Sequence, residues 1–412
     1  MTINDTDTKV LRDLGRQIAE IAALPEQQAR IERWEALNGL RPQRPMVMID
    51  QIPWHEMNVD DELTVRSEDP FCRAIETNLR RTLYKWRHMR VDMVVEPYVD
   101  VPKVIRGAHL GINAEDDRAV LDPENDVVGH YYRDQLKTPA DLAKIHTPDV
   151  RLDAEATNER AEKAHAIFDG ILEVRMQGMH PSFAFWDRIS EWHGVEASLI
   201  DLVDRPDFIH AMVARITDAY HAMLDQLEAQ GLLGYPMATV HCTGAYTDEL
   251  PAAGYDPDHV RAEDLWTFGM AQIFSSVSPR MHQAFELDYV YPWYERFGLG
   301  YYGCCEPLDD KIDIIRTIPN LRKISMSPWV DPTIAADRIG TAYVYSHKPS
   351  PSLFAEDVWQ PERAREELVE VLDQTQDCIV EVILKDLSTV RYEPQRLWAW
   401  AEIAAEVTAE YA

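Results

Sequence analysis

Thiol, imidazole and carboxylate groups follow short apolar runs that have the length of buried strands. They are His241 and Cys242 after 237–240, Cys304, Cys305 and Glu306 after 299–302, and His347 after 341–345. In a barrel of parallel strands, all carboxyl ends open on one face and the following side chains gather there. Cysteine sulfur and histidine nitrogen are preferred zinc ligands, and a catalytic zinc keeps three protein ligands and one open position. The sequence therefore predicts a metal site formed by His241, Cys304 and Cys305.

The alternative for these thiols is ordinary burial, because free cysteine is among the most buried residue types. Adjacent residues of a strand point to opposite faces, so only one of Cys304 and Cys305 looks inward unless the strand ends before them. Both interpretations stay open for this pair. Cys72 and Cys378 are expected in the core.

Other side chains near predicted strand ends could take part in the reaction. We expect His347 or Glu306 to handle a proton beside the metal, and Asp100 could serve as an acid or base near the second strand. Asp50 follows the first strand. The residues expected to contact a substrate are His180, Tyr302, Trp54 and Trp329.

The elements that must position these groups predict an α/β fold, specifically a (β/α)8 TIM barrel with N-terminal helices and an insertion after the second strand. Apolar runs at 46–50, 92–96, 171–176, 237–240, 299–302, 321–325 and 341–345 are separated by helical patterns, including 204–227 and 262–285. Strands separated by single helices pair in parallel through right-handed crossovers. An eighth strand is expected in the helix-rich segment after 176.

We expect one domain over residues 1–412. Residues 1–44 form an N-terminal helical extension, and the Pro- and Asp-rich stretch 97–150 is an insertion or lid. Residues 361–412 are expected to be C-terminal helices that pack on the outside.

The charge excludes some partners. With 41 Lys and Arg against 71 Asp and Glu, the net charge is −30. A phosphate backbone or an anionic membrane needs a basic surface, so neither nucleic acid nor membrane is expected as a partner. The first ten residues lack a signal-peptide pattern, and five cysteines without a small-domain spacing fit a reducing compartment. We therefore expect a cytoplasmic protein.

Two familiar motifs are rejected on context. Gly298, Gly300 and Gly303 match the glycine spacing of dinucleotide-binding loops, but they lie in a predicted strand instead of between a strand and a helix. His55 and Glu56 begin a zinc-protease pattern, but position 59 is Val59 and not a second histidine.

Four segments resemble the uroporphyrinogen decarboxylase superfamily, which includes corrinoid-linked methyltransferases. They are Arg44-Pro-Met-Val-Met-Ile49, the helix 204–227, Tyr302-Gly-Cys304 and Ser346-His-Lys-Pro-Ser-Pro351. The resemblance implies a TIM barrel. In the methyltransferase branch it implies a zinc ion, held by a His-x-Cys motif and a later Cys, that activates a thiol. Here the motif reads Tyr302-Gly303-Cys304, the later position falls on Lys348 or Ser350, and only Cys304 carries over.

The predicted function is therefore metal-assisted methyl transfer, with a corrinoid protein or a methylated small molecule as donor. We expect a small-molecule substrate and a homodimer. One alternative is a metal-independent decarboxylase or lyase that uses Asp100 and His180. Another is a non-catalytic protein that carries a tetrapyrrole or corrinoid.

Overall fold

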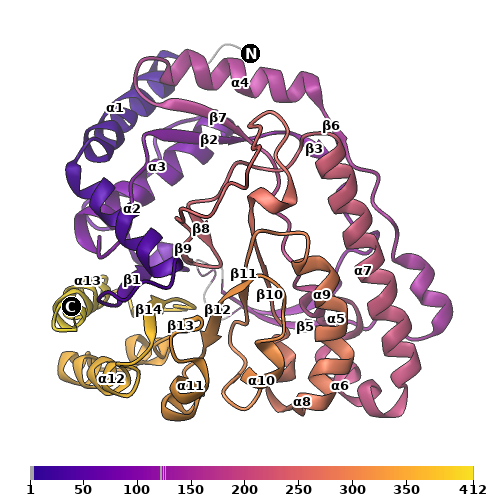
Figure 1. Cartoon of the computed structure of the whole chain (residues 1–412). Coiled ribbons are helices and arrows are strands. Elements are labelled where there is room, and N and C mark those ends of the chain that lie inside the picture. The colour runs from indigo at the N-terminus through magenta and orange to yellow at the C-terminus, as the bar shows by residue number, and fades with distance from the viewer. Residues whose placement is uncertain (1–3, 121–122, 124, 126, 412) are drawn as a thin grey trace.

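The core is a parallel β-sheet with helices on its outer side (Figure 1). The computed structural model describes residues 4–120, 123, 125 and 127–411. Six strands form the sheet in the order β1 (Met46–Ile49), β14 (Ile379–Leu384), β13 (Val344–His347), β12 (Leu321–Met326), β11 (Leu299–Tyr302) and β10 (Trp266–Gly269). Every neighbouring pair is parallel. The first core strand thus lies beside the last, which is the neighbour relationship of a barrel seam.

A second, shorter ladder continues the curvature. Strand β2 (Tyr98–Pro102) pairs in parallel with β7 (Glu173–Gln177). Beyond β7, isolated parallel bridges join Met179 to Leu233 and Phe183 to Gly269. Within the residues that the structure describes, the ladders do not join into one continuous eight-stranded barrel. The fold is an α/β fold whose parallel sheet curls into half a barrel.

The helices surround this sheet. They are α1 (Asp5–Ala22), α2 (Pro25–Asn38), α3 (Pro70–His88), α4 (Ala154–Phe168), α5 (Phe185–His193), α6 (Val195–Asp204), α7 (Pro206–Ala229), α8 (Pro279–His282), α9 (Asp288–Tyr294), α10 (Ile312–Ile315), α11 (Pro332–Ile339), α12 (Pro361–Gln374) and α13 (Gln395–Ala409). Helix α7 begins with Pro206, whose fixed φ suits a first helical position. Its apolar stripe, from Phe208 to Leu227, is buried.

Three short antiparallel strand pairs lie outside the main sheet. Strands β3 (Ile105–Arg106) and β6 (Arg151–Leu152) are antiparallel, as are β4 (Asp116–Ala119) and β5 (Gly129–Tyr132). Strands β8 (Thr239–Val240) and β9 (Thr243–Gly244) form a third antiparallel pair. The turn between β8 and β9 contains His241 and Cys242, both with positive φ.

A buried ion pair holds this β8–β9 hairpin against the sheet. Lys323 Nζ lies 2.7 Å from Glu381 Oε2, and both side chains are fully buried. Thr243 Oγ1 donates to the same carboxylate at 2.6 Å, and Lys323 also donates to Gly244 O at 3.0 Å. The hairpin is therefore fixed by charge-assisted hydrogen bonds to β12 and β14.

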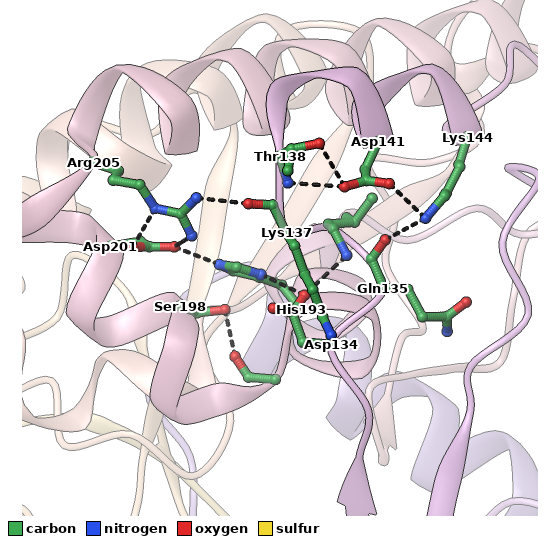
Figure 2. Close-up of polar contacts among 12 residues, drawn as sticks. Asp134, Gln135, Lys137, Thr138, Asp141, Lys144, His193, Ser198, Asp201 and Arg205 are labelled. Carbon is green, nitrogen blue, oxygen red and sulfur yellow. Dashed lines mark hydrogen bonds and ion pairs between the residues drawn. The ribbon is translucent and has the colours of Figure 1, made fainter.

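A second polar cluster ties the insertion to the helices (Figure 2). His193, at the end of α5, has one ring nitrogen 3.0 Å from Asp134 and the other 2.7 Å from Asp201. Asp201 also receives two hydrogen bonds from Arg205, which in turn donates to Lys137 O. Both ring nitrogens of His193 therefore face carboxylate oxygens. This His193 clamp holds residues 134–137 of the insertion on α5 and α6.

The structure corrects several predicted elements. The strand expected at 92–96 lies at β2, so the expected insertion 97–150 begins with a core strand. The run 237–240 ends in the β8–β9 hairpin and not in a sheet strand, and β10 lies inside the stretch expected to be helical at 262–285. Residues 361–412 are not helical throughout, because β14 lies between α12 and α13. The run from Ile379 to Leu384 is buried on both faces and therefore lacks the alternation of a half-exposed strand.

Candidate active site

A thiol and an ammonium group meet at the carboxyl ends of β11 and β14. Lys385 Nζ lies 3.1 Å from Cys304 Sγ, and both side chains are almost completely buried. Gly303 makes the sharp turn after β11 that presents Cys304. Its φ is +95°, and an added Cβ would lie 2.5 Å from Leu308. The backbone at this position therefore requires glycine.

Cys304 is positioned to be a thiolate. The Cys305 thiol, 3.5 Å away, has the largest effect on it, and His241 and Lys348 act in the same direction. Together they outweigh burial and lower the pKa of Cys304 well below its usual range. Burial is the largest single influence and would lower the pKa of Lys385, but Cys304, Cys242 and Asp386 together outweigh it and raise that pKa. The two shifts agree on a Cys304 thiolate paired with a Lys385 ammonium.

Cys305 is the protonated member of the pair. Its thiol donates to Asp386 Oδ2 at 3.4 Å, and its closeness to Cys304 together with burial raises its pKa. Asp386 also lies 3.6 Å from Lys385. Two thiols, one ammonium and one carboxylate thus form a closed ring of contacts, which we call the dithiol cluster (Cys304, Cys305, Lys385 and Asp386).

A second lysine orients the backbone of Cys304. Lys348, the first residue after β13, donates to Cys304 O at 3.1 Å, and Ser325 donates to the same oxygen at 2.8 Å. Burial lowers the pKa of the Lys348 ammonium. Glu306 accepts hydrogen bonds from Cys304 N at 2.9 Å and from Ala271 N at 3.1 Å. Glu306 thus fixes the loops after β10 and β11, with each of its two oxygens bonded to a backbone amide.

The β8–β9 turn brings His241 and Cys242 to the same place. His241 acts on Cys304, and its ring stacks 4.8 Å from Phe268. Burial, followed by the Lys348 charge, lowers the pKa of His241 to about 4, so the ring is neutral at neutral pH. Its Nε2 is buried and has no hydrogen-bond partner among the residues that the structure describes. Cys242 lies near Asp50, and burial raises its pKa to about 12.

A carboxyl group approaches this region from α5. Asp187 accepts hydrogen bonds from Gln272 Nε2 at 3.2 and 3.4 Å. Burial is the main cause that raises the pKa of Asp187 to about 6, and the Cys304 charge adds to it. Asp187 can therefore exchange a proton near neutral pH.

The dithiol cluster opens into a cavity of about 250 Å³. Its walls include Trp329, Lys348 and prolines of the loops after β12 and β13. The Trp329 side chain is 75% exposed. The cavity wall therefore combines charged groups, namely Lys348, Lys385 and Asp386, with apolar surface.

The structure brings together His241, Cys304, Cys305 and Trp329 from the predicted site. His347 is buried on the other side of β13, against α12, and its neighbour Lys348 faces Cys304 in its place. Tyr302 is buried behind the sheet, where its hydroxyl contacts His282 at 2.6 Å and Glu286 at 2.9 Å. These two positions follow from strand parity, because adjacent residues face opposite sides.

The remaining predicted residues lie away from Cys304. Trp54 packs edge-on against Tyr84, outside the cavity wall. Asp100, 42% exposed, lies 4.0 Å from Arg175 on the β2–β7 ladder. His180 Nε2 contacts Tyr235 O at 2.6 Å and lies close enough to influence Asp100. Asp100 and His180 therefore form a separate polar cluster.

Sequence reasoning missed Lys385, Asp386 and Asp187. Lys385 directly follows β14, so assigning 379–384 to a strand would have placed it at the active face. Asp187 carried no such signal. Among the described residues, no three His, Cys, Asp or Glu side chains converge closely enough to hold a metal ion. None of the helices in that part of the chain has the length and apolar character that a membrane crossing needs.

Of the comparisons with known proteins, only the one with solved structures gave a match. No protein-family model and no curated protein matches the sequence. Among solved structures, the chain is similar to a methyltransferase from Methanosarcina mazei, with a TM-score of 0.48 and 12% sequence identity. The alignment covers 93% of this chain and 99% of that one.

Proposed function

We propose that this protein is a group-transfer enzyme of an incomplete (β/α)8 barrel type, and that the Cys304 thiolate is its reactive group. The observation that carries the proposal is the 3.1 Å contact between Cys304 Sγ and Lys385 Nζ. A thiolate is the nucleophilic form of cysteine, and a neighbouring ammonium keeps it ionised at neutral pH. This arrangement supports attack on an electrophilic carbon.

The cavity favours a small substrate. Its volume of about 250 Å³ lies just below the usual range for ligand sites, which begins at about 300 Å³. Lys348 in its wall favours an anionic group on the substrate, whereas the charge of Lys385 is matched by Cys304 and Asp386. Trp329 with the neighbouring prolines favours an apolar part.

The transferred group that we favour is methyl. The sequence resembles a superfamily that contains methyltransferases, and a methyl carbon bound to a good leaving group is a target for a soft thiolate. In this step the Cys304 sulfur bonds to the methyl carbon while the leaving atom departs with its electron pair. We also propose that a corrinoid protein is the partner that exchanges the methyl group.

Iodomethane tests this proposal directly. We expect one methyl group on Cys304 of the wild-type protein, located by peptide mass analysis, and none on that peptide in Cys304→Ser. Chemically reduced cobalamin added afterwards should remove the methyl group and restore the unmodified mass. Methylation spread evenly over the five cysteines, or a methyl group that cobalamin cannot remove, would contradict transfer through Cys304.

Zinc-assisted transfer is the second candidate. Two thiolates bound to one tetrahedral zinc at about 2.3 Å lie roughly 3.7 Å apart, close to the 3.5 Å between Cys304 and Cys305. The unpartnered Nε2 of His241 is a possible third ligand. In the present arrangement, however, Lys385 contacts the Cys304 sulfur, and no third ligand from the described part of the chain joins the pair. The residues therefore do not fit a three-ligand zinc site without rearrangement.

Elemental analysis separates the two candidates. Zinc in stoichiometric amount in the wild type, and its loss in the double variant Cys304→Ser, Cys305→Ser, would support the zinc form. If neither protein contains zinc, the Lys385-paired thiolate is the supported form.

A further inference from the structure

The dithiol cluster contains a second nucleophilic sulfur that the proposed reaction does not use. Cys305 Sγ lies 3.5 Å from Cys304 Sγ, so the two atoms are already in van der Waals contact. Both sulfurs face the cavity, which is open to small solutes. Its sulfur forms no bond in the methyl-transfer step, in which Cys305 only helps to keep Cys304 ionised.

We infer that Cys304 and Cys305 are a redox modification site, at which a hydroperoxide converts the pair to a disulfide between adjacent residues. The inference rests on the contacts among Cys304, Cys305, Lys385 and Asp386. Only its consequence rests on the proposed function. That consequence is that oxidation removes the Cys304 nucleophile and stops the transfer reaction.

The chemistry balances with these residues and a hydroperoxide. The Cys304 thiolate attacks one peroxide oxygen, which gives a sulfenic acid and releases water or an alcohol after protonation. The Cys305 sulfur then attacks the Cys304 sulfur, and hydroxide leaves. Asp386, 3.4 Å from the Cys305 sulfur, accepts the thiol proton and returns it to the departing hydroxide as water. The peroxide is reduced by two electrons and the two thiols are oxidised by two.

The geometry also makes the modification reversible. The Cα atoms of adjacent residues joined by a trans peptide lie about 3.8 Å apart, whereas ordinary disulfides join Cα atoms about 4.4–6.8 Å apart. The disulfide between adjacent residues is therefore strained, and strained disulfides are reduced more readily. A cellular dithiol would restore the reduced pair.

The remaining thiols are less suited to the role. Cys72 is completely buried in the core between α1 and α3. Cys378 donates a hydrogen bond to the backbone, at 3.6 Å from Ala336 O. Cys242 lies in the same region as Cys304, close to Lys385 and Lys348, and is the one competitor that an experiment must distinguish.

Hydrogen peroxide is the probe. After peroxide treatment, denaturation and alkylation of free thiols, the wild-type protein should lose two alkylatable thiols of its five. Both losses should map to the peptide that contains Cys304 and Cys305, with a mass lower by two hydrogen atoms, and dithiothreitol should reverse them. Cys305→Ser should stop at a sulfenic acid on Cys304 that dimedone traps. Cys242→Ser should behave like the wild type.

Two controls keep the result interpretable. The unfolded wild-type protein in urea should form the disulfide at least tenfold more slowly, because the Lys385 and Asp386 contacts are absent. Asp386→Asn should slow disulfide formation without slowing sulfenic acid formation. Direct conversion of wild-type Cys304 to sulfinic acid, or a disulfide to Cys242, would overturn the inference. Since the readout is mass, disulfide formation without methylation of Cys304 would reject the proposed function and leave this inference standing.

Discussion

Lys385 Nζ lies 3.1 Å from Cys304 Sγ although the two residues are 81 positions apart in the sequence. Their strands, β14 and β11, are separated in the sheet by β13 and β12. In a flat sheet with a strand spacing of about 4.8 Å, three steps would place the strand ends roughly 14 Å apart. The curl of the sheet, together with side chains that point inward, closes this distance. The ion pair is thus a product of the half-barrel.

We predict that Asp187→Asn stabilises the protein at pH 8. The pKa of Asp187 is raised to about 6 in the folded protein. The protonated form of Asp187 therefore favours the folded state at low pH, and this part of the unfolding free energy is lost as the pH rises through 6. Removing the charge should raise the free energy of unfolding by roughly 1–3 kcal/mol at pH 8. The difference should vanish below about pH 4. Urea unfolding at both pH values measures it.

The exposed Asp218→Asn is the matched control and should change stability equally little at both pH values. An Asp187→Asn protein that is no more stable at pH 8 than the wild type would show that Asp187 is not destabilised by its charge.

The Lys323–Glu381 pair gives a second prediction. Glu381→Leu leaves the Lys323 ammonium buried without its partner, and it also releases Thr243 and the β8–β9 hairpin. Breaking a buried pair by removing one partner costs about 3–5 kcal/mol of unfolding free energy. The double variant Lys323→Met, Glu381→Leu should recover most of that loss, because two apolar side chains need no partners. A double variant as unstable as Glu381→Leu would contradict this account.

The His193 clamp gives a third prediction. Burial opposes ionisation of Asp201, but hydrogen bonds from Arg205 and His193 outweigh it and lower the pKa of Asp201. The stabilisation is therefore complete above about pH 4, the pKa of an unfolded aspartate, and is lost as the pH falls further. Asp201→Asn should lower the unfolding free energy by about 1–3 kcal/mol at pH 7. At about pH 3, below the pKa of an unfolded aspartate, the same substitution should lower the unfolding free energy less.

Limited proteolysis provides an independent readout of this clamp. Cleavage within residues 134–144 should be faster in Asp201→Asn, because Asp134 and Lys137 lose their common anchor on α5 and α6 (Figure 2). Asp204→Asn, at an exposed position of the same helix, should cleave like the wild type. Equal cleavage of all three proteins would show that the clamp does not hold the insertion.

The sequence was most informative where a strand is a plain apolar run. The runs at 46–50, 299–302 and 321–325 match β1, β11 and β12 to within one residue. Strand β10 was missed because its four residues lie between helical patterns. Strand β14 was missed because a run buried on both faces has no alternation to distinguish it from a helix.

For the site, the sequence predicted which residues lie at strand ends, but it did not predict which residues contact one another. The sequence placed Cys304, Cys305 and His241 at strand ends, and the structure brings them together. It also placed His347 there, but β13 extends to His347 itself, and a shift of one residue in the strand end reverses the face. Lys385 could not be paired with Cys304 from the sequence, because their contact depends on how far the sheet curls.

The most direct test is the pH dependence of Cys304 alkylation by iodoacetamide in the wild type, Lys385→Met and Lys144→Met. Lys144 is a half-exposed lysine of the insertion and serves as the control. We predict that wild-type Cys304 reacts at a rate that is constant from pH 6 to pH 8. In Lys385→Met the rate at pH 6 should fall at least tenfold and rise with pH, as for a thiol with a higher pKa. A wild-type rate that rises tenfold per pH unit toward about pH 8.5, as for an ordinary thiol, would contradict the Lys385-paired thiolate.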